Sequence, residues 1–390
     1  MAKLREIQLA TALKERLVQG HPWVYRNHVP PDVQLASGSW VRVRCGGWTS
    51  YGLWDNKGSI AIRLFSPRQI PDARWLQAQV EAAWELRSPL RQTCTAYRWL
   101  FGEGDGLPGI TVDLYGDFAV VQTYMEGATA LLDWLVDALK ATAPLQGITL
   151  RTQHLDRDLE TNGKTQLLWG KTPPVDLVVQ EYGLQFQVNL QTGQKTGLFL
   201  DHRENRRFVE GLSQGRTVLN CFAYTGAFSL YALRGGASQV TSVDIGKGLA
   251  DAAATNVRLN SLDQQRHTFI TQDCFDLLDR YVQERQTFDL VILDPPSFAK
   301  SKQNRFAALR AYTKLNALAL RCVAPGGLLV TASCTSQISP EAFREMLAAA
   351  GGNCDRRIQI IHEAGQPLDH PVPAQFPEGR YLKFVVGRVR

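Results

Sequence analysis

The stretch Val218-Leu-Asn-Cys-Phe-Ala-Tyr-Thr-Gly-Ala-Phe-Ser229 indicates a buried strand that passes through a tight turn into a helix. Gly226 lies in the turn, and a residue without a side chain lets the backbone approach a bound ligand closely. The stretch has neither the Gly-x-Gly-x-x-Gly spacing of a dinucleotide-binding loop nor the lysine of a P-loop. We therefore expect an α/β sheet whose ligand is neither a dinucleotide nor a nucleoside triphosphate. One glycine alone is weak evidence, so the prediction depends on the neighbouring strands.

From about residue 200 onward, strands alternate with helices. Five nearly continuous apolar runs indicate strands that are covered on both faces, at residues 217–222, 239–244, 268–273, 288–294 and 327–333. A helical stripe of apolar side chains occupies 305–322. Two more strands, 357–361 and 381–386, have no sizeable helix between them, which predicts an antiparallel hairpin at the sheet edge. The sequence thus predicts a doubly wound, Rossmann-like α/β domain with its site at the carboxyl ends of the strands.

Two smaller domains are expected before this one. Residues 1–72 contain short alternating strands separated by glycines, a pattern typical of a small β-barrel. Residues 73–182 combine an amphipathic helix over 73–91 with a hairpin over 110–124, and they predict a small α+β middle domain. With the α/β domain over 183–390, the 390-residue chain has three domains, as its length permits.

Positive charge is concentrated in the first of these domains. The formal net charge is +6, and residues 1–72 hold ten Lys or Arg against five Asp or Glu, whereas the other residues hold 33 against 32. The alternation in Trp40-Val-Arg-Val-Arg44 places Arg42 and Arg44 on one face of a strand. A concentrated basic face is what a phosphate-binding module needs, but a solvated surface with a chance imbalance explains the count equally well.

Other classes of protein are disfavoured by composition. The seven cysteines show no Cys or Cys/His spacing of a zinc or iron–sulfur site, so we expect no metal and no disulfide framework. There is no apolar run of about 18 residues, and we expect no membrane span. Met1-Ala-Lys-Leu-Arg-Glu6 is followed by no apolar region of a secretory signal, which favours the cytoplasm.

Three aspartates end successive strands at one edge of the predicted sheet. Asp244 comes 18 residues after Gly226, where α/β sites place an acid for ribose hydroxyls. Asp273 ends the third strand, where it could accept a hydrogen bond from an adenine amine, and Asp294 ends the fourth. Any one of them could instead cap a following helix. The three together favour a single ligand crevice.

The loop Asp294-Pro-Pro-Ser-Phe298 follows the fourth strand. Two consecutive prolines fix a rigid loop whose carbonyls point outward. Such a loop can hold the edge of a flat base while Phe298 stacks on it. The alternative is a turn that only terminates the strand. Together with the aspartates, the loop predicts a substrate-base site formed by Pro295, Pro296, Ser297 and Phe298.

Seven stretches then suggest a family. They are Glu103-Gly-Asp-Gly-Leu-Pro-Gly109, Gln191-Thr-Gly-Gln-Lys-Thr-Gly197, Asp201-His-Arg-Glu-Asn-Arg206, Asn220-Cys-Phe-Ala-Tyr-Thr-Gly-Ala-Phe228, Asp294-Pro-Pro-Ser-Phe298, Ser333-Cys-Thr-Ser336 and Phe376-Pro-Glu-Gly-Arg-Tyr-Leu-Lys383. With them, residues 92–390 resemble the bacterial class I large-subunit (23S) ribosomal RNA methyltransferases of the cytosine-5 type. Residues 1–72, with Gly20-His-Pro-Trp-Val-Tyr25, are similar to a PUA domain, which favours RNA as the partner of the basic face.

The resemblance implies S-adenosylmethionine as the cofactor and 23S ribosomal RNA as the partner, and it suggests a homodimer. Asp244 would bind the ribose and Asp273 the adenine. Lys195 and Arg203 would line the same pocket and meet the carboxylate of the cofactor. The methionine part would be held by Phe222, Ala223, Tyr224, Thr225 and Gly226.

Cys334 ends the fifth strand and is the candidate nucleophile, with Asp294 as its neighbour across the crevice. Carbon 5 of cytosine is too poor a nucleophile to take a methyl group directly. A thiolate that adds to carbon 6 makes carbon 5 able to attack the sulfonium methyl, while Asp294 binds the polar edge of the base. The alternative is a buried cysteine without a chemical role, the commonest state of a single Cys.

One departure from other cytosine-5 RNA methyltransferases bears on this mechanism. They carry a second Cys in the loop after the fourth strand, and here Asp294–Phe298 contains none. Either another group promotes release of the product, or the target is an exocyclic base amine, for which direct transfer needs no thiol. A third hypothesis is a non-catalytic RNA-binding or ribosome-assembly factor.

Overall fold

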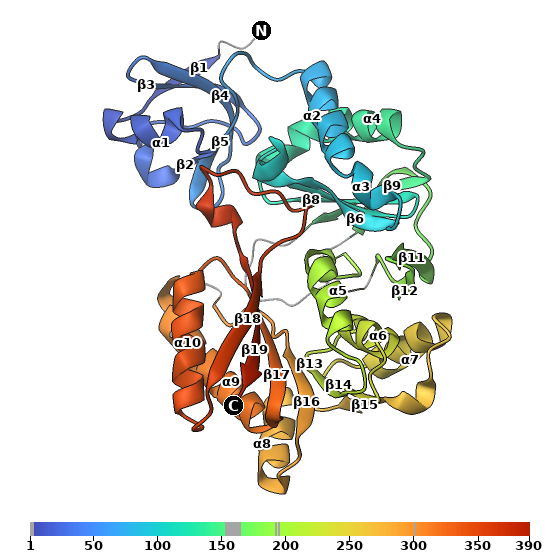
Figure 1. The fold of residues 1–390 in the computed structure, drawn as a ribbon. Coiled ribbons are helices and arrows are strands. Elements are labelled where there is room, and N and C mark those ends of the chain that lie inside the picture. Colours follow the sequence, from blue (N-terminus) through green and yellow to red (C-terminus); the bar gives the residue numbers. More distant parts are fainter. Residues whose placement is uncertain (1–3, 153–164, 192, 194–195, 300–301) are drawn as a thin grey trace. The chain divides into compact units, whose positions relative to one another are not determined.

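The computed structural model describes residues 4–152, 165–191, 193, 196–299 and 302–390, drawn in colour in Figure 1. The chain forms two compact units. Unit 1 comprises Met1–Val179, Val188–Leu200 and Leu368–Gly379, and unit 2 comprises Gln180–Gln187, Asp201–Pro367 and Arg380–Arg390. Unit 1 includes both of the smaller domains expected from the sequence, and the expected boundaries after residues 72 and 182 stay predictions.

The N-terminal sheet of unit 1 has the strand order β1-β3-β4-β5-β2. Its strands are β1 (Arg5–Gln8), β2 (Trp23–Tyr25), β3 (Trp40–Cys45), β4 (Trp48–Trp54) and β5 (Ile60–Ser66), with the short helix α1 (Lys14–Val18). Apolar side chains of β1, β3 and β5 form the buried core beneath it. The guanidinium groups of Arg42 and Arg44 both approach the carboxylate of Glu6, at 3.8 and 3.1 Å, which confirms that they share the exposed face.

The second sheet of unit 1 has the order β10-β9-β8-β7-β6. It consists of β6 (Ala96–Phe101), β7 (Ile110–Tyr115), β8 (Phe118–Thr123), β9 (Gly147–Thr152) and β10 (Thr165–Gly170). The hairpin expected over 110–124 is confirmed, with Tyr115 opposite Phe118. The helix expected over 73–91 is instead interrupted: α2 (Ala73–Leu86) ends, and α3 (Ser88–Arg91) carries Pro89 in its first turn, which has no N–H to continue the first helix.

Another helix of unit 1 is preceded by a 3-10 turn. Residues Glu126–Leu131 form a 3-10 turn, and α4 (Leu132–Thr142) follows directly. The segment Leu368–Gly379 joins this unit from far along the chain. There the ring of Phe376 lies edge-on to Trp23, 4.5 Å between centroids, and the backbone N–H of Arg98 donates to Asp369 at 2.9 Å.

Unit 2 is built on a seven-stranded sheet of order β15-β14-β13-β16-β17-β19-β18. Its strands are β13 (Thr217–Cys221), β14 (Gln239–Asp244), β15 (His267–Thr271), β16 (Phe288–Leu293), β17 (Val323–Cys334), β18 (Ile358–Ala364) and β19 (Leu382–Val389). The first five are parallel, and β19 pairs antiparallel with β17 and β18. This confirms the doubly wound domain and its antiparallel edge. A two-stranded ladder, β11 (Leu177–Glu181) with β12 (Leu184–Val188), precedes it.

The strand order places the site. From β13 the chain runs outward through β14 and β15, then returns to β16 on the other side of β13. The direction of winding therefore changes between β13 and β16, and in open α/β sheets ligands bind beyond the carboxyl ends of the strands at this switch point. Gly226 follows β13, Asp294 follows β16, and Cys334 is the last residue of β17.

Helices cover both faces of this sheet. Figure 1 shows α6 and α7 on one side and α9 and α10 on the other. Apolar residues of β13, β16 and β17, such as Leu219, Leu293 and Leu329, are fully buried beneath them. The bounds are α5 (Arg203–Gly211), α6 (Ala227–Arg234), α7 (Leu249–Leu259), α8 (Cys274–Glu284), α9 (Arg305–Arg321) and α10 (Pro340–Gly352). Within the described part of the chain, no helix is both long and apolar enough to cross a membrane.

Candidate active site

The turn after β13 has an unusual backbone. Gly226 has φ 83°, as the sequence predicts, and Phe222 and Tyr224 have φ 59° and 50°. Left-handed conformations cost non-glycine residues on the order of 1–3 kcal/mol each and gather at functional sites. Asp244 at the end of β14 supports the turn, because its Oδ2 accepts a hydrogen bond from the backbone N–H of Tyr224 at 2.9 Å. The carboxylate therefore lies beside the turn, as the sequence predicts.

Asp244 and Asp273 differ in their local roles. Asp273 caps α8, since its Oδ1 accepts from the backbone N–H groups of Phe275 and Asp276 at 2.8 and 3.2 Å. The capping alternative is thus realised for Asp273, and its contact with adenine stays a prediction. Asp244 caps no helix. Its Oδ1 accepts from the N–H of Gly246 at 3.0 Å, and each carboxylate oxygen keeps capacity for another donor.

This donor set fits a nucleoside cofactor with a methionine tail. Asp244 offers acceptors for ribose hydroxyls at the sheet edge, and the turn exposes backbone at the N-terminus of α6, which favours a negative group. Lys195, expected to meet the cofactor carboxylate, lies outside the described residues. Arg203, the first residue of α5, is fully buried, and its Nε approaches Glu204 at 3.4 Å. Its contact with the cofactor also stays a prediction.

The residues of the loop after β16 differ in burial and in contacts. Pro295 is buried, Pro296 is exposed, and the hydroxyl of Ser297 donates to the carbonyl of Ala299 at 3.2 Å. The ring of Phe298 is half-buried and packs 4.7 Å from that of Tyr312, between centroids. Part of the Phe298 ring is therefore engaged in the core, and its stacking on a base stays a prediction.

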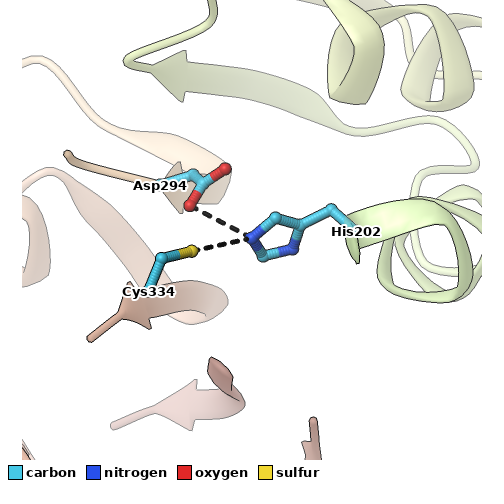
Figure 2. Close-up of side chains that lie close together, drawn as sticks. All are labelled: His202, Asp294 and Cys334. Carbon is cyan, nitrogen blue, oxygen red and sulfur yellow. Dashed lines mark hydrogen bonds and ion pairs between the residues drawn. The ribbon is translucent and has the colours of Figure 1, made fainter. Parts of the chain in front are cut away.

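Figure 2 shows three side chains that converge where β16 and β17 end: His202, Asp294 and Cys334. Nε2 of His202 lies 3.2 Å from Oδ1 of Asp294 and 3.6 Å from Sγ of Cys334. The proximity of Cys334 and Asp294 is what the sequence predicts. His202, which precedes α5 and is fully buried, is an addition that sequence reasoning missed.

The charges in this cluster influence one another. Burial by itself lowers the pKa of His202, but the charge and hydrogen bond of Asp294 raise it to about 10. Burial and the nearby Asp294 raise the pKa of the Cys334 thiol, while His202 opposes the rise. Near neutral pH His202 is therefore an imidazolium beside a neutral thiol.

Lys383 lies on β19 in the same part of unit 2 and was also missed. Its ammonium group is buried and donates to the backbone carbonyls of Thr335 and Tyr381. Burial lowers its pKa to about 8. Because Thr335 directly follows Cys334, Lys383 fixes the backbone on which the thiol is carried.

His, Asp and Cys are also ligands that zinc uses, and the three donor atoms lie within 4.8 Å of one another. The expected absence of a metal stays a prediction. If it is right, exhaustive treatment with a chelator leaves the rate of methylation unchanged, and elemental analysis of the purified protein finds less than stoichiometric zinc. A rate that falls on chelation and returns on addition of zinc contradicts it.

Comparison with known proteins gives the family. Residues 114–358 match the S-adenosylmethionine-dependent methyltransferase family, and residues 7–67 match the PUA-like domain. The ribosomal RNA large subunit methyltransferase I of Erwinia tasmaniensis is 38% identical over 98% of both chains, and that of Escherichia coli O157:H7 is 36% identical over 98% of both.

Solved structures agree in fold. SMU.776, a methyltransferase crystallised with S-adenosylhomocysteine, aligns with a TM-score of 0.88 over 99% of this chain and 100% of its own, at 24% identity. The chain therefore belongs to the S-adenosylmethionine-dependent methyltransferase family that includes the ribosomal RNA large subunit methyltransferases I, and it contains a PUA-like domain.

Proposed function

We propose that this protein transfers a methyl group from S-adenosylmethionine to carbon 5 of a cytosine in 23S ribosomal RNA. The observation that carries the proposal is the position of Cys334, whose Sγ lies beside Asp294 at the switch point of the sheet. The names of the relatives, which are large-subunit ribosomal RNA methyltransferases, and the PUA-like domain support RNA as the substrate.

Cys334 supplies the nucleophile that activates carbon 5 of the base. Its thiolate adds to carbon 6 of the base, and carbon 5 then attacks the methyl group that the bound cofactor supplies. Asp294 holds the polar edge of the base, and the loop Pro295–Phe298 delimits the space for the ring. Nucleoside mass spectrometry of 23S ribosomal RNA from cells with and without the gene tests the proposal, because 5-methylcytosine at one position is expected to disappear.

The cofactor site gives a first prediction. S-adenosylhomocysteine should bind, whereas NAD and ATP should not, because the turn at 222–226 has no phosphate-binding glycines or lysine. Asp244→Ala should weaken binding about tenfold or more, since hydrogen bonds to a charged group are lost. Isothermal calorimetry measures both, with Asp279→Ala on the exposed side of α8 as control. Unchanged affinity in Asp244→Ala contradicts the assignment.

The basic face gives a second prediction. The double variant Arg42→Gln/Arg44→Gln should weaken RNA binding and lower the slope of log affinity against log salt by about 1–2, because each phosphate contact releases about one counterion. Affinity for S-adenosylhomocysteine should not change. A matched variant, Arg280→Gln/Arg285→Gln, removes two exposed arginines at the end of α8. An equal loss of slope in both variants shows that only net charge matters.

An exocyclic base amine remains the second candidate target. It is favoured by the Asp294–Phe298 loop, whose sequence contains no second cysteine. The mass of the nucleoside does not distinguish a methyl on carbon 5 from one on the amine, but its fragmentation and retention do. A protein that binds RNA without changing any nucleoside supports the non-catalytic hypothesis instead. A homodimer in the cytoplasm is part of the proposal, and sedimentation of the purified protein tests the dimer.

A further inference from the structure

Cytosine-5 methylation moves two protons besides the methyl group. The thiol of Cys334 must lose its proton before it adds to the base, and the hydrogen on carbon 5 must leave before the product is released. The loop after β16 has no second cysteine to take part in this. We propose that His202 is a further catalytic residue, the acid–base group that takes the proton from Cys334 and returns it at release. This inference rests on the proposed cytosine-5 activity.

One nitrogen of His202 faces both partners. Nε2 lies 3.6 Å from Sγ of Cys334 and 3.2 Å from Oδ1 of Asp294. Figure 2 shows the ring approaching from a different element than the two residues it meets. A base that serves the thiol has to be within hydrogen-bond reach of it, and apo geometries of catalytic pairs are often longer than in the reacting complex. His202 meets this condition.

The other nitrogen is held in a way that permits a change of protonation. Nδ1 lies 3.0 Å from Nδ2 of Asn205, one turn further along α5. After a half rotation the amide presents its oxygen, so Asn205 can accept from Nδ1–H, which keeps its proton while Nε2 exchanges its own. The rings of Phe228 and Phe384 pack edge-on against His202, at centroid distances of 5.5 and 6.2 Å. The ring is thus fixed in place while its protonation can alternate.

Charged and titratable groups from the surrounding elements complete the environment. Asp294 follows β16, Asp201 directly precedes His202, and Lys383 projects from β19. The hydroxyl of Ser333 donates to that of Tyr312 of α9, at 3.2 Å. Only Asp294 is in direct contact with Nε2 among the described residues that carry a negative charge, so Asp294 is the partner with which His202 exchanges a proton.

The protons balance with these two carriers. The Nε2 proton passes to Oδ1 of Asp294, and Nε2 then takes the proton of the thiol as the Sγ–C6 bond forms and the C5=C6 electron pair shifts toward C5. Asp294 hands its proton to ring N3, C5 bonds to the methyl group, and the electron pair of the broken S–CH₃ bond stays on the cofactor sulfur. Asp294 next removes the C5 proton, and the freed pair restores C5=C6.

Restoring that double bond expels Sγ, which recovers its proton from Nε2 of His202, and Asp294 then passes the proton taken from C5 to Nε2. The proton on N3 is released to water with the product, so each turnover yields one methylated base, S-adenosylhomocysteine and one proton. Neither carrier has a net change in charge over the cycle.

The test measures turnover of His202→Gln against pH, with 23S ribosomal RNA from cells that lack the gene as substrate. Glutamine keeps a polar side chain at this position, but it neither gains nor loses a proton over the pH range of the assay. Turnover near pH 7 should fall by about 10²–10⁴-fold, while affinity for S-adenosylhomocysteine stays within about twofold. The rate of the variant should then rise about tenfold per pH unit below the pKa of the Cys334 thiol, which burial raises, since hydroxide must ionise the thiol.

The native protein should show no such rise. The pKa of His202 is raised to about 10, so its imidazolium persists well above neutral pH. A matched variant, His267→Gln, removes another partly buried histidine, bonded to Ser242 at 2.8 Å, and should keep the flat profile. If His202→Gln loses cofactor binding, the measurement is repeated with His202→Asn, and loss in both shows a structural role and overturns the proposal.

The outcomes separate this inference from the proposed function. Near-native turnover of His202→Gln, or a reduced rate with an unchanged pH profile, overturns the role of His202 but leaves cytosine-5 methylation standing when Cys334→Ser is inactive. Activity that survives in Cys334→Ser overturns the covalent route itself. A steep pH profile in His202→Gln alone supports the proposal.

Discussion

Cys334→Ser should abolish methylation, with a fall in turnover of at least ~10³-fold, comparable to the loss of other covalent nucleophiles. An alcohol yields almost no anion at neutral pH, so it cannot replace the thiolate that adds to carbon 6. The fold should persist because serine is nearly isosteric, and the new hydroxyl can hydrogen-bond to His202, whose Nε2 lies 3.6 Å from the sulfur in the native protein. Affinity for S-adenosylhomocysteine should therefore be unchanged.

The covalent step can be caught directly. RNA transcribed with 5-fluorocytidine in place of cytidine should trap the native protein, because fluorine cannot leave carbon 5 as a cation and elimination stalls after methyl transfer. A denaturing gel then shows a protein–RNA band that depends on S-adenosylmethionine. Cys334→Ser should give no band. The control Cys354→Ser, which changes a half-exposed cysteine at the end of α10, should be trapped like the native protein.

Two results would contradict the covalent route. Near-normal turnover of Cys334→Ser removes the need for a nucleophile and makes an exocyclic amine the better target. Trapping that persists in Cys334→Ser means that another side chain forms the bond.

The sheet of unit 2 was predictable because its strands carry a strong local signal. Apolar runs covered on both faces locate β13, β14, β16 and β17 to within a few residues, and their order of alternation with helices predicts parallel pairing. Since carboxyl ends of parallel strands share one edge, the approach of Asp294 to Cys334 follows from sequence alone. Neither the parallel pairing nor the approach of these two residues depends on a contact between distant helices.

His202 and Lys383 could not be found in the same way. His202 precedes α5, outside the strand–helix alternation, and reaches Cys334 across 132 positions of sequence. No spacing rule connects those positions. Lys383 stands in an apolar strand, where its charge argues for exposure, yet the side chain turns to buried carbonyls. The stretches Asp201–Arg206 and Phe376–Lys383 contained both residues, but a resemblance does not state which side chain has which role.

The predicted helix boundary over 73–91 was wrong for a different reason. The amphipathic pattern over 73–91 continues through Arg87, so periodicity predicts one helix. The structure ends α2 at Leu86 because Pro89 cannot donate a backbone hydrogen bond, and the buried guanidinium of Arg87 turns inward to Asp105, at 2.6 Å. A local backbone effect and one long-range ion pair thus decide the boundary, and the second of these is invisible in sequence.

The largest expected effect on stability comes from Glu181→Gln. Glu181 and Arg206 are almost completely buried, and the guanidinium donates two hydrogen bonds to the carboxylate, at 2.9 and 2.7 Å. The hydroxyl of Tyr231 also donates to the carboxylate, at 3.0 Å. Removing the negative charge leaves a guanidinium without its counterion in the interior, which costs about 3–5 kcal/mol. Because Arg206 lies on α5, the same change loosens the helix that follows His202.

The loss of stability in Glu181→Gln has to be measured in unit 2 alone, because the two units need not unfold together. All nine tryptophans precede residue 170, so tryptophan fluorescence follows unit 1 and should show nearly the native urea midpoint. Hydrogen exchange of peptides from α5 and α6, read by mass spectrometry, should show the loss of protection. The matched control is Glu210→Gln, whose partner Arg234 forms an equally short but half-exposed pair, at 2.6 Å, and it should lose no more than about 1 kcal/mol.

A double variant distinguishes an unpaired charge from lost packing. Glu181→Leu/Arg206→Met removes both charges and keeps most of the volume, and replacement of buried pairs by apolar side chains is often neutral or stabilising. We expect it to recover most of the protection that Glu181→Gln loses, because the hydroxyl of Tyr231 loses the carboxylate but keeps the backbone carbonyl of residue 181, at 3.3 Å. If the double variant is as unstable as Glu181→Gln, the pair stabilises α5 by its hydrogen-bond geometry. The position of His202 then depends on a polar contact that apolar packing cannot replace.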